Sequence, residues 1–332
     1  MFLPTLLLLT LLLVFPSSPL ANATIRDDET WLDTDGNRIN AHGGGMLYDD
    51  GVWYWYGECK GDSTWRTPGV DWECYRTEAG GVNCYSSTDL IHWHHRGLVL
   101  TPDTTADSPI STYGVIERPK VIRCADTGRY VMWIHIDNDD YSKACAGVAV
   151  SDSPTGPFRF LHDCRPMGEE SRDMTLFQDI DGRCYLICST RGNSTLRIYL
   201  LTPDATDFTG TYVEALPGQS REAPAIMRHD GRYWMLTSGC SGWDPNEAQV
   251  AVADSMLGHW SAIGNPCQGP DANNTFHAQS TYIIPPHGNR PAIAMFDRWN
   301  KTQLDHSTYL WLPITFRGGA MVIRKDEKRK TK

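Results

Sequence analysis

The sequence predicts an all-β fold, a five-bladed β-propeller, because it contains a repeat of β-rich segments. Five times such a segment reaches a short polar turn and continues into a second β-rich segment, a pattern typical of β-hairpins. The turns lie at residues 49–51, 126–128, 179–182, 229–231 and 286–288. Each pair is followed by a third segment, and several continue into a fourth. Five units of four strands predict five propeller blades, with a pair of β-sandwiches as the alternative.

The strands after the turns can be placed in order along the chain. The second strands are expected at residues 52–56, 129–134, 183–187, 232–236 and 291–296, and the third strands at 83–87, 146–150, 196–200, 249–252 and 307–311. Residues 59–83 lengthen the first unit and are interpreted as an insertion tied by a disulfide. We expect one propeller domain over residues 24–322, followed by a charged, solvated tail at 323–332.

The N-terminus has the features of a targeting segment. An apolar run over residues 6–14 precedes prolines and serines, and Ala21-Asn22-Ala23 fits a small-residue cleavage site. Residues 1–23 are therefore predicted to be a signal peptide, and the protein to be secreted and extracellular. An uncleaved anchor is the alternative, although the run is short for a bilayer span. No later segment has 18 consecutive apolar residues, so no other membrane contact is expected.

Composition narrows the class of protein further. The net charge of −10 argues against a nucleic-acid partner, which would require a basic surface. The 12 Trp and 14 Tyr residues suit either a sugar-binding cleft or a large β core. Ten cysteines in a secreted chain predict disulfides, without fixing their pairing. Asn193, Asn273 and Asn300 begin N-glycosylation motifs, to be used if the host is eukaryotic.

Polar side chains recur at one position of the predicted inner strands. The residue nine positions before the turn glycine is polar or ionisable in units one, three, four and five, and the second unit fits if its turn is two residues longer. Inner strands of a propeller line its axis, so these side chains should meet in one pocket. The five residues are His42, Glu117, Asp173, Glu222 and Gln279.

Three carboxylic acids in one pocket have a chemical meaning. Carboxylates that share a site repel one another, which raises at least one pKa towards the working range of a general acid. Two carboxyl groups around a sugar bond, one of them protonated, are the usual machinery of glycoside hydrolysis. Each acid alone could instead be held in a salt bridge, since Arg118 follows Glu117 and Arg172 precedes Asp173.

Several longer motifs resemble glycoside hydrolase family 43, and most closely its exo-β-1,3-galactanase branch. They are INAHGGG at 39–45, WYWYGE at 53–58, IERPKV at 116–121, SRDMTLF at 171–177, SREAPA at 220–225, TSGCSGW at 237–243 and QSTY at 279–282. The resemblance covers about residues 35–320. It implies a five-bladed propeller of inverting enzymes, in agreement with the repeat.

The resemblance also implies roles for individual residues. Glu222 matches the general acid and Asp173 the residue that tunes its pKa. The usual aspartate base of the first blade is replaced by His42, and in the galactanase branch a glutamine, matched by Gln279, is assigned the base role. Glu117, Glu58 and Tyr141 match residues that bind the terminal galactose.

The base itself stays open between two residues. A glutamine amide is a very weak base unless it acts as its imidic tautomer or only positions the water. His42 is the chemically easier base near neutral pH, or else an orienting residue. Gly43, Gly44 and Gly45 lack the Lys-Ser/Thr and the helix that a phosphate loop requires.

The predicted function is exo-hydrolysis of β-1,3-galactan, releasing galactose with inversion. An α-L-arabinofuranosidase or β-xylosidase of the same family is one alternative, and a catalytically silent sugar-binding propeller is another. We expect no cofactor and no dedicated metal site, since no calcium loop is present. The expected partner is a polysaccharide or oligosaccharide.

Overall fold

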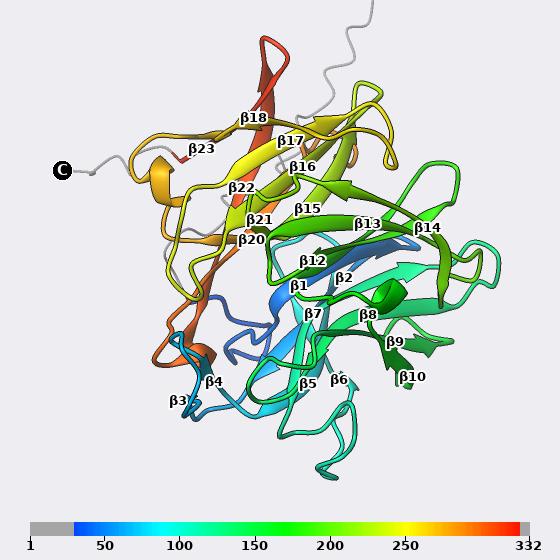
Figure 1. Cartoon of the computed structure of the whole chain (residues 1–332), viewed down its shortest axis with the longest axis vertical. Coiled ribbons are helices and arrows are strands. Elements are labelled where there is room, and N and C mark those ends of the chain that lie inside the picture. The colour runs from blue at the N-terminus through cyan, green and yellow to red at the C-terminus, as the bar shows by residue number, and fades with distance from the viewer. Residues whose placement is uncertain (1–29, 326–332) are drawn as a thin grey trace, which may run out of the picture.

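The computed structural model describes residues 30–325, and they form a five-bladed β-propeller (Figure 1). The predicted fold class is therefore confirmed. The predicted signal peptide and the last seven residues of the predicted tail lie outside the described residues. Within the described part, no helix is long and apolar enough to cross a bilayer.

Each blade is an antiparallel sheet whose first strand in the chain is the innermost. Blade one holds β1 (His42–Asp49), β2 (Val52–Lys60), β5 (Ala79–Ser87) and β6 (His94–Leu100). Blade two holds β7 (Val115–Arg123), β8 (Tyr130–Asp137), β9 (Cys145–Ser151) and β10 (Arg159–Cys164). Blade three holds β11 (Met174–Gln178), β12 (Cys184–Thr190), β13 (Thr195–Leu201) and β14 (Phe208–Ala215). Blade four holds β15 (Arg221–His229), β16 (Arg232–Gly239), β17 (Gln249–Ala253) and β18 (Ser261–Gly264).

Blade five has one strand more than the four predicted. It holds β20 (Gln279–Ile284), β21 (Ile293–Arg298), β22 (Thr308–Arg317) and β23 (Ala320–Arg324), and the short β19 (Cys267–Gln268) pairs in parallel with β23. Ile323 is fully buried between Ile314 and Cys267, so the propeller continues to Arg324. It thus ends two residues beyond the predicted boundary at 322. Three 3₁₀ turns complete the elements: η2 (Pro166–Gly168), η3 (Ala272–Asn274) and η4 (Leu304–His306).

The hydrophobic core consists of five clusters, each between two neighbouring blades. The alternation of side chains along a strand gives every inner and middle strand an apolar face towards each neighbour. Successive pairs around the ring include Tyr56 with Met132, Trp133 with Leu186, Ile198 with Met235, Leu236 with Phe296, and Trp55 with Trp311. The inner strands β1, β7, β11, β15 and β20 contact one another in turn around the axis.

No strand is shared between blade one and blade five among the described residues, so side chains close the ring there. We call this boundary the seam. The hydroxyl of Tyr309 accepts a hydrogen bond from the Ala41 amide (2.9 Å) and donates to the Ile39 carbonyl (3.1 Å). Trp311 packs edge-on against Trp55, with ring centroids 5.0 Å apart. The seam therefore depends on aromatic packing and a few hydrogen bonds rather than on a backbone ladder.

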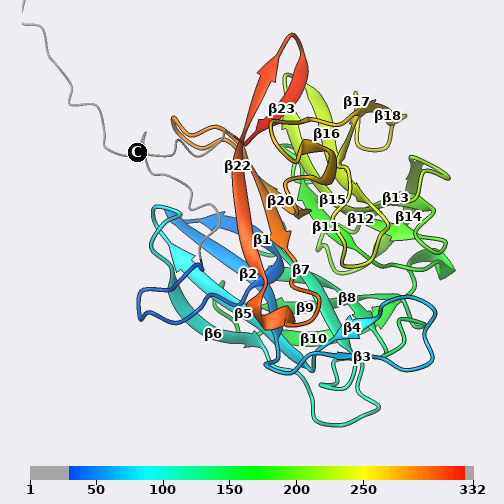
Figure 2. The same cartoon turned by 90° about the vertical axis from the view of Figure 1, so that its left-hand side faces the viewer.

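The insertion in blade one is present, but the predicted disulfide is not. All ten cysteines are free in the structure, Cys59 and Cys74 of the insertion among them. The insertion carries a short hairpin of β3 (Trp65–Arg66) and β4 (Tyr75–Arg76), which Figure 2 shows at the lower right. Noncovalent contacts hold it instead, as described below.

Candidate active site

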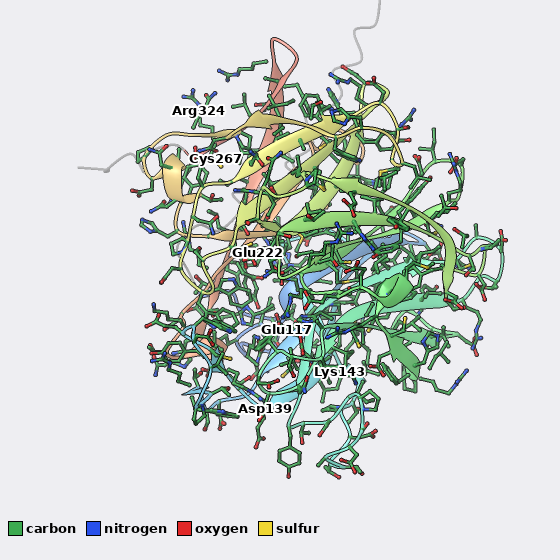
Figure 3. The ribbon with its side chains drawn as sticks, in the orientation of Figure 1. Glu117, Asp139, Lys143, Glu222, Cys267 and Arg324 are labelled. Atoms are coloured by element: carbon green, nitrogen blue, oxygen red, sulfur yellow. The ribbon has the colours of Figure 1, made fainter. Side chains whose placement is uncertain are left out.

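The five residues predicted to ring the axis all lie at the same end of the inner strands. His42 and Gln279 begin β1 and β20, Glu222 is the second residue of β15, and Glu117 the third of β7. Asp173 directly precedes β11. Figure 3 labels Glu117 and Glu222, which lie where the inner strands meet. The register counted from the turns therefore places these residues correctly on the strands.

A recurring β-bulge aims several of these side chains. In blades one, two and four the pairing of the inner strand shifts directly after the predicted site residue. The next residue, Gly43, Arg118 or Ala223, has a φ of 56°, 52° or 52° respectively. Bulges bend a strand and redirect side chains, and a left-handed backbone costs a non-glycine residue about 1–3 kcal/mol. The bulge that recurs in these three blades therefore serves to direct the site side chains rather than to strengthen strand pairing.

The three glycines of blade one permit close approach of charged side chains. A Cβ on Gly43 would lie 2.6 Å from Oε1 of Glu58, and one on Gly45 would lie 2.5 Å from Cδ of Lys120. Lys120 is fully buried, and its Nζ donates to the Gly43 carbonyl (2.7 Å). The glycine run thus makes room for Glu58 and Lys120 beside the axis.

Gln279 makes four hydrogen bonds at the centre of the pocket. Its Nε2 donates to Oε1 of Glu222 (3.0 Å) and to Oγ of Ser238 (3.1 Å). Its Oε1 accepts from Nη2 of Arg118 (2.6 Å) and from the indole nitrogen of Trp299 (2.9 Å). Neither Arg118 nor Trp299 can accept a proton from this oxygen. The surroundings therefore favour the ordinary amide of Gln279 over its imidic tautomer.

Arg118 links Gln279 to Asp173. The Nε of Arg118 lies 2.7 Å from Oδ1 of Asp173, while its Nη2 holds Gln279. Burial, and then the negative charge of Asp173, raise the pKa of Glu222 to about 8, with the charge of Arg118 opposing them. Glu222 is therefore mostly protonated at neutral pH, the state that a general acid requires.

A second charged cluster lies beside the first. Nζ of Lys60 lies 2.8 Å from Oε2 of Glu58 and 3.3 Å from Oε1 of Glu117, and Tyr141 donates its hydroxyl proton to the same Glu117 oxygen (2.8 Å). Burial raises the pKa of Glu58 to about 7 against the opposing charge of Lys60. Burial also acts to raise the pKa of Glu117, but Lys60 and His135 hold it well below its usual range. Glu58, Glu117 and Tyr141, predicted as sugar-binding residues, are thus brought together.

His42 lies beneath the pocket rather than in it. Its ring has no exposed surface and stacks on Tyr309, with centroids 5.0 Å apart. Its Nδ1 lies 3.5 Å from Oδ1 of Asp297, and its ring contacts Trp299, which in turn holds Gln279. This placement favours the orienting role for His42, because a base must reach a water in the pocket.

Sequence reasoning did not assign a role to Lys60, Trp243 or Trp299. Nζ of Lys60 lies 5.2 Å from the ring centroid of Trp243 and 5.6 Å from that of Trp299, within the range of cation–π contacts. Lys60 could have been suspected, since it is two residues after Glu58 on one strand and so faces the same side. Trp299 follows β21, and no repeat pointed to it.

The insertion lies between β2 and β5, at residues 61–78 rather than the predicted 59–83. We call it the strap, and it is tied to three other blades. Nζ of Lys301 in blade five contacts Glu73 of the strap (2.5 Å) and Asp244 of blade four (3.0 Å). The ring of Trp72 meets Tyr141 of blade two edge-on at 5.4 Å. Strap residues 76–78 also line a cavity with Glu58, Lys60, Glu117 and Tyr141. The strap therefore borders the cluster that holds Glu117.

A protonated carboxylic acid with further carboxylates around a propeller axis fits the chemistry of glycoside hydrolysis, and the comparisons with known proteins show that class. The sequence model described as "Glycosyl hydrolases family 43" matches residues 62–281. The chain belongs to this family and is a glycoside hydrolase. No curated protein sequence matches it.

Solved structures of family members are closely similar over most of the chain. A family 43 β-1,3-galactosidase crystallised with galactodeoxynojirimycin is 40% identical, with a TM-score of 0.85, covering 91% of this chain and 98% of its own. The exo-β-1,3-galactanase of Phanerochaete chrysosporium, crystallised with galactose, is 35% identical with a TM-score of 0.79, over 89% of this chain and 65% of its own. An exo-β-1,3-galactanase from Clostridium thermocellum is 35% identical with a TM-score of 0.80, over 90% of this chain and 64% of its own. The resemblance to the family and to its galactanase branch is thus confirmed.

Proposed function

We propose that the protein is a secreted, inverting exo-β-1,3-galactanase that releases galactose from the non-reducing end of β-1,3-galactan. One observation carries this proposal: Glu222, whose pKa is raised, lies at the axis in contact with Gln279, and Arg118 connects Gln279 to Asp173. The β-1,3-galactosidase and galactanase relatives support the choice of sugar and linkage.

In the proposed reaction Glu222 gives its proton to the oxygen of the leaving sugar while a water attacks C1 from the opposite face. The proton that this water loses passes to solvent, and Glu222 takes up a proton from solvent before the next turnover. Asp173 keeps the pKa of Glu222 high through its charge. Glu117, Glu58 and Tyr141 bind the hydroxyl groups of the terminal galactose, and Lys60 holds the two carboxylates between which it lies.

Gln279 is assigned to position the water, which requires its amide to move away from Glu222. An inverting enzyme separates the acid from the group that activates the water by about 6.5–9.5 Å. In the structure Nε2 of Gln279 is 3.0 Å from Glu222, so the amide must leave the acid when the sugar enters. His42 supports this arrangement through Trp299.

The test is to incubate the enzyme separately with β-1,3-galactan, arabinan and xylan and to identify the sugars released. We expect galactose alone from galactan, and ¹H NMR of the first product to show the α-anomer. Arabinose or xylose as the main product would assign the protein to the arabinofuranosidase or xylosidase alternative. No release from any of the three, with galactan still bound, would support the silent sugar-binding alternative. Detection of the chain in culture medium, beginning near residue 24, tests secretion.

A further inference from the structure

Asn193, the first residue of an N-glycosylation motif, lies against Glu222. It sits in the turn between β12 and β13, where its φ of 61° is left-handed. Its Nδ2 donates to Oε2 of Glu222 at 3.3 Å, and its own Oδ1 is buried without a hydrogen-bond partner. The Sγ of Cys240 lies 3.3 Å from the Ser220 carbonyl oxygen and 3.7 Å from that of Asn193, so the turn packs against blade four.

The hydrogen bonds of Glu222 restrict where its proton can reside. Oε1 already accepts from Nε2 of Gln279, so the proton of the neutral acid belongs on Oε2. Oε2 then becomes a donor facing Asn193 and needs an acceptor. The unpartnered Oδ1 of Asn193 becomes that acceptor when the side-chain amide turns by 180°.

We propose, on the basis of the function proposed above, that Asn193 positions Glu222 in both of its protonation states, and that its motif carries no glycan in the active enzyme. In the resting enzyme Oδ1 of Asn193 accepts the proton of Oε2. When a sugar binds, the O–H of Oε2 leaves Oδ1 of Asn193 and turns to the leaving oxygen, which takes the proton. The amide then turns back and Nδ2 donates to the carboxylate. Asn193 itself neither gains nor loses a proton, so it acts as a positioning residue.

A glycan on Asn193 is incompatible with this arrangement. Glycosylation bonds the first sugar to Nδ2, which faces Glu222 in the structure and takes the buried position of Oδ1 after the amide turns, so neither orientation leaves room for a sugar. Asn273, the first residue of another motif, is exposed and free of this conflict. The sequence motif alone does not distinguish the two positions.

The groups that face Glu222 determine how its pKa should change when Asn193 is replaced. Asp173 raises the pKa of Glu222, whereas Arg118 and hydrogen bonds from Cys240 and Gln279 lower it. Asn193→Asp places another carboxylate beside Oε2. It should raise the titration midpoint of the Glu222 carboxyl by about one pH unit or more. Asn193→Gly admits water to a buried acid and should lower the midpoint, while glycine accepts the left-handed backbone without strain.

The experiment is a ¹³C NMR titration of the Glu222 carboxyl in the full chain, with its signal identified by its loss in Glu222→Gln. Thr195→Val is the matched control: it removes the glycosylation motif but keeps the Asn193 amide, losing two long hydrogen bonds, one from Gly218 (3.4 Å) and one with Oγ of Ser194 (3.5 Å). We expect the control to titrate like the wild type. Unchanged midpoints in both Asn193 variants would overturn the proposal, and the glycine variant keeps the test decisive if Asn193→Asp does not fold.

Two further readouts separate positioning from a purely structural role. On β-1,3-galactan, Asn193→Gly should lower kcat about tenfold or more with a smaller change in KM. After expression in a eukaryotic secretory host, peptide mass spectrometry should find Asn193 unmodified in active enzyme, and full glycosylation with an undiminished kcat would also overturn the proposal. The NMR titration needs no substrate, so a wild type that releases no galactose counts against the proposed function alone.

Discussion

Replacing Glu222 by Gln tests the acid directly, and the structure fixes how the loss should vary with pH. With a pKa of about 8, about nine in ten Glu222 carboxyls carry a proton at pH 7 and about one in ten at pH 9. General acid catalysis contributes about 10²–10⁴-fold to the rate. The variant should therefore lose about that factor in kcat at pH 7 and about tenfold less at pH 9, where most of the wild-type acid is already ionised.

The assay is galactose release from β-1,3-galactan between pH 5 and pH 10, with the wild type and the variant measured side by side. The wild-type rate should fall tenfold for each pH unit well above pH 8, and Glu222→Gln should show no such fall. Glu58→Gln is the control, because burial raises the pKa of Glu58 to about 7. Ionisation of Glu58 could therefore produce an alkaline limb of its own in the pH–rate profile.

An alkaline limb that persists unchanged in Glu222→Gln would refute this reasoning. The limb would then belong to another group, such as Lys120, whose pKa burial and the neighbouring Arg118 lower to about 7. A variant as active as the wild type at pH 7 would show that a different residue donates the proton.

Three further predictions concern residues around the acid. Gln279→Ala should abolish hydrolysis and Gln279→Glu should retain part of it, as measured by kcat; a fully active alanine variant would exclude Gln279 as the residue that holds the water. Gly43→Ala should lower activity at least about tenfold, because its Cβ would meet Glu58 at 2.6 Å, and wild-type kinetics would show that the cluster shifts without cost. Lys301→Met should raise KM several-fold with little change in kcat by releasing the strap, and an unchanged KM would show that the strap does not shape the pocket.

The blades could be predicted because a hairpin turn is a local signal. Polar turn residues between β-rich segments fix where a strand reverses, and counting back from them located Glu222 and Gln279 at the ends of inner strands. The extra strand β19 was missed because it has only two residues and pairs with β23, far along the chain. A repeat also says nothing about an element that only one blade contains.

The contacts that organise the site could not be predicted, because they join distant blades. Arg118 appeared in the sequence as a neighbour of Glu117, yet it holds Asp173 and Gln279 from two other blades. His42 has the register of a site residue, but the ring of Tyr309, 267 positions later in the chain, covers it. Its burial therefore depends on blade five and leaves no trace near residue 42.

The seam between blades one and five gives the pocket an unequal resistance to opening. Gln279 and Trp299 lie on one side of it and Glu58 and Lys60 on the other. Within residues 30–325 no backbone ladder joins any two blades, and the chain itself links consecutive blades but does not link blade five to blade one. Regions with few shared hydrogen bonds open at a lower free energy than the whole molecule. Warming should therefore separate the two halves of the pocket before the blades themselves unfold. A sugar that binds both halves should stabilise the closed seam.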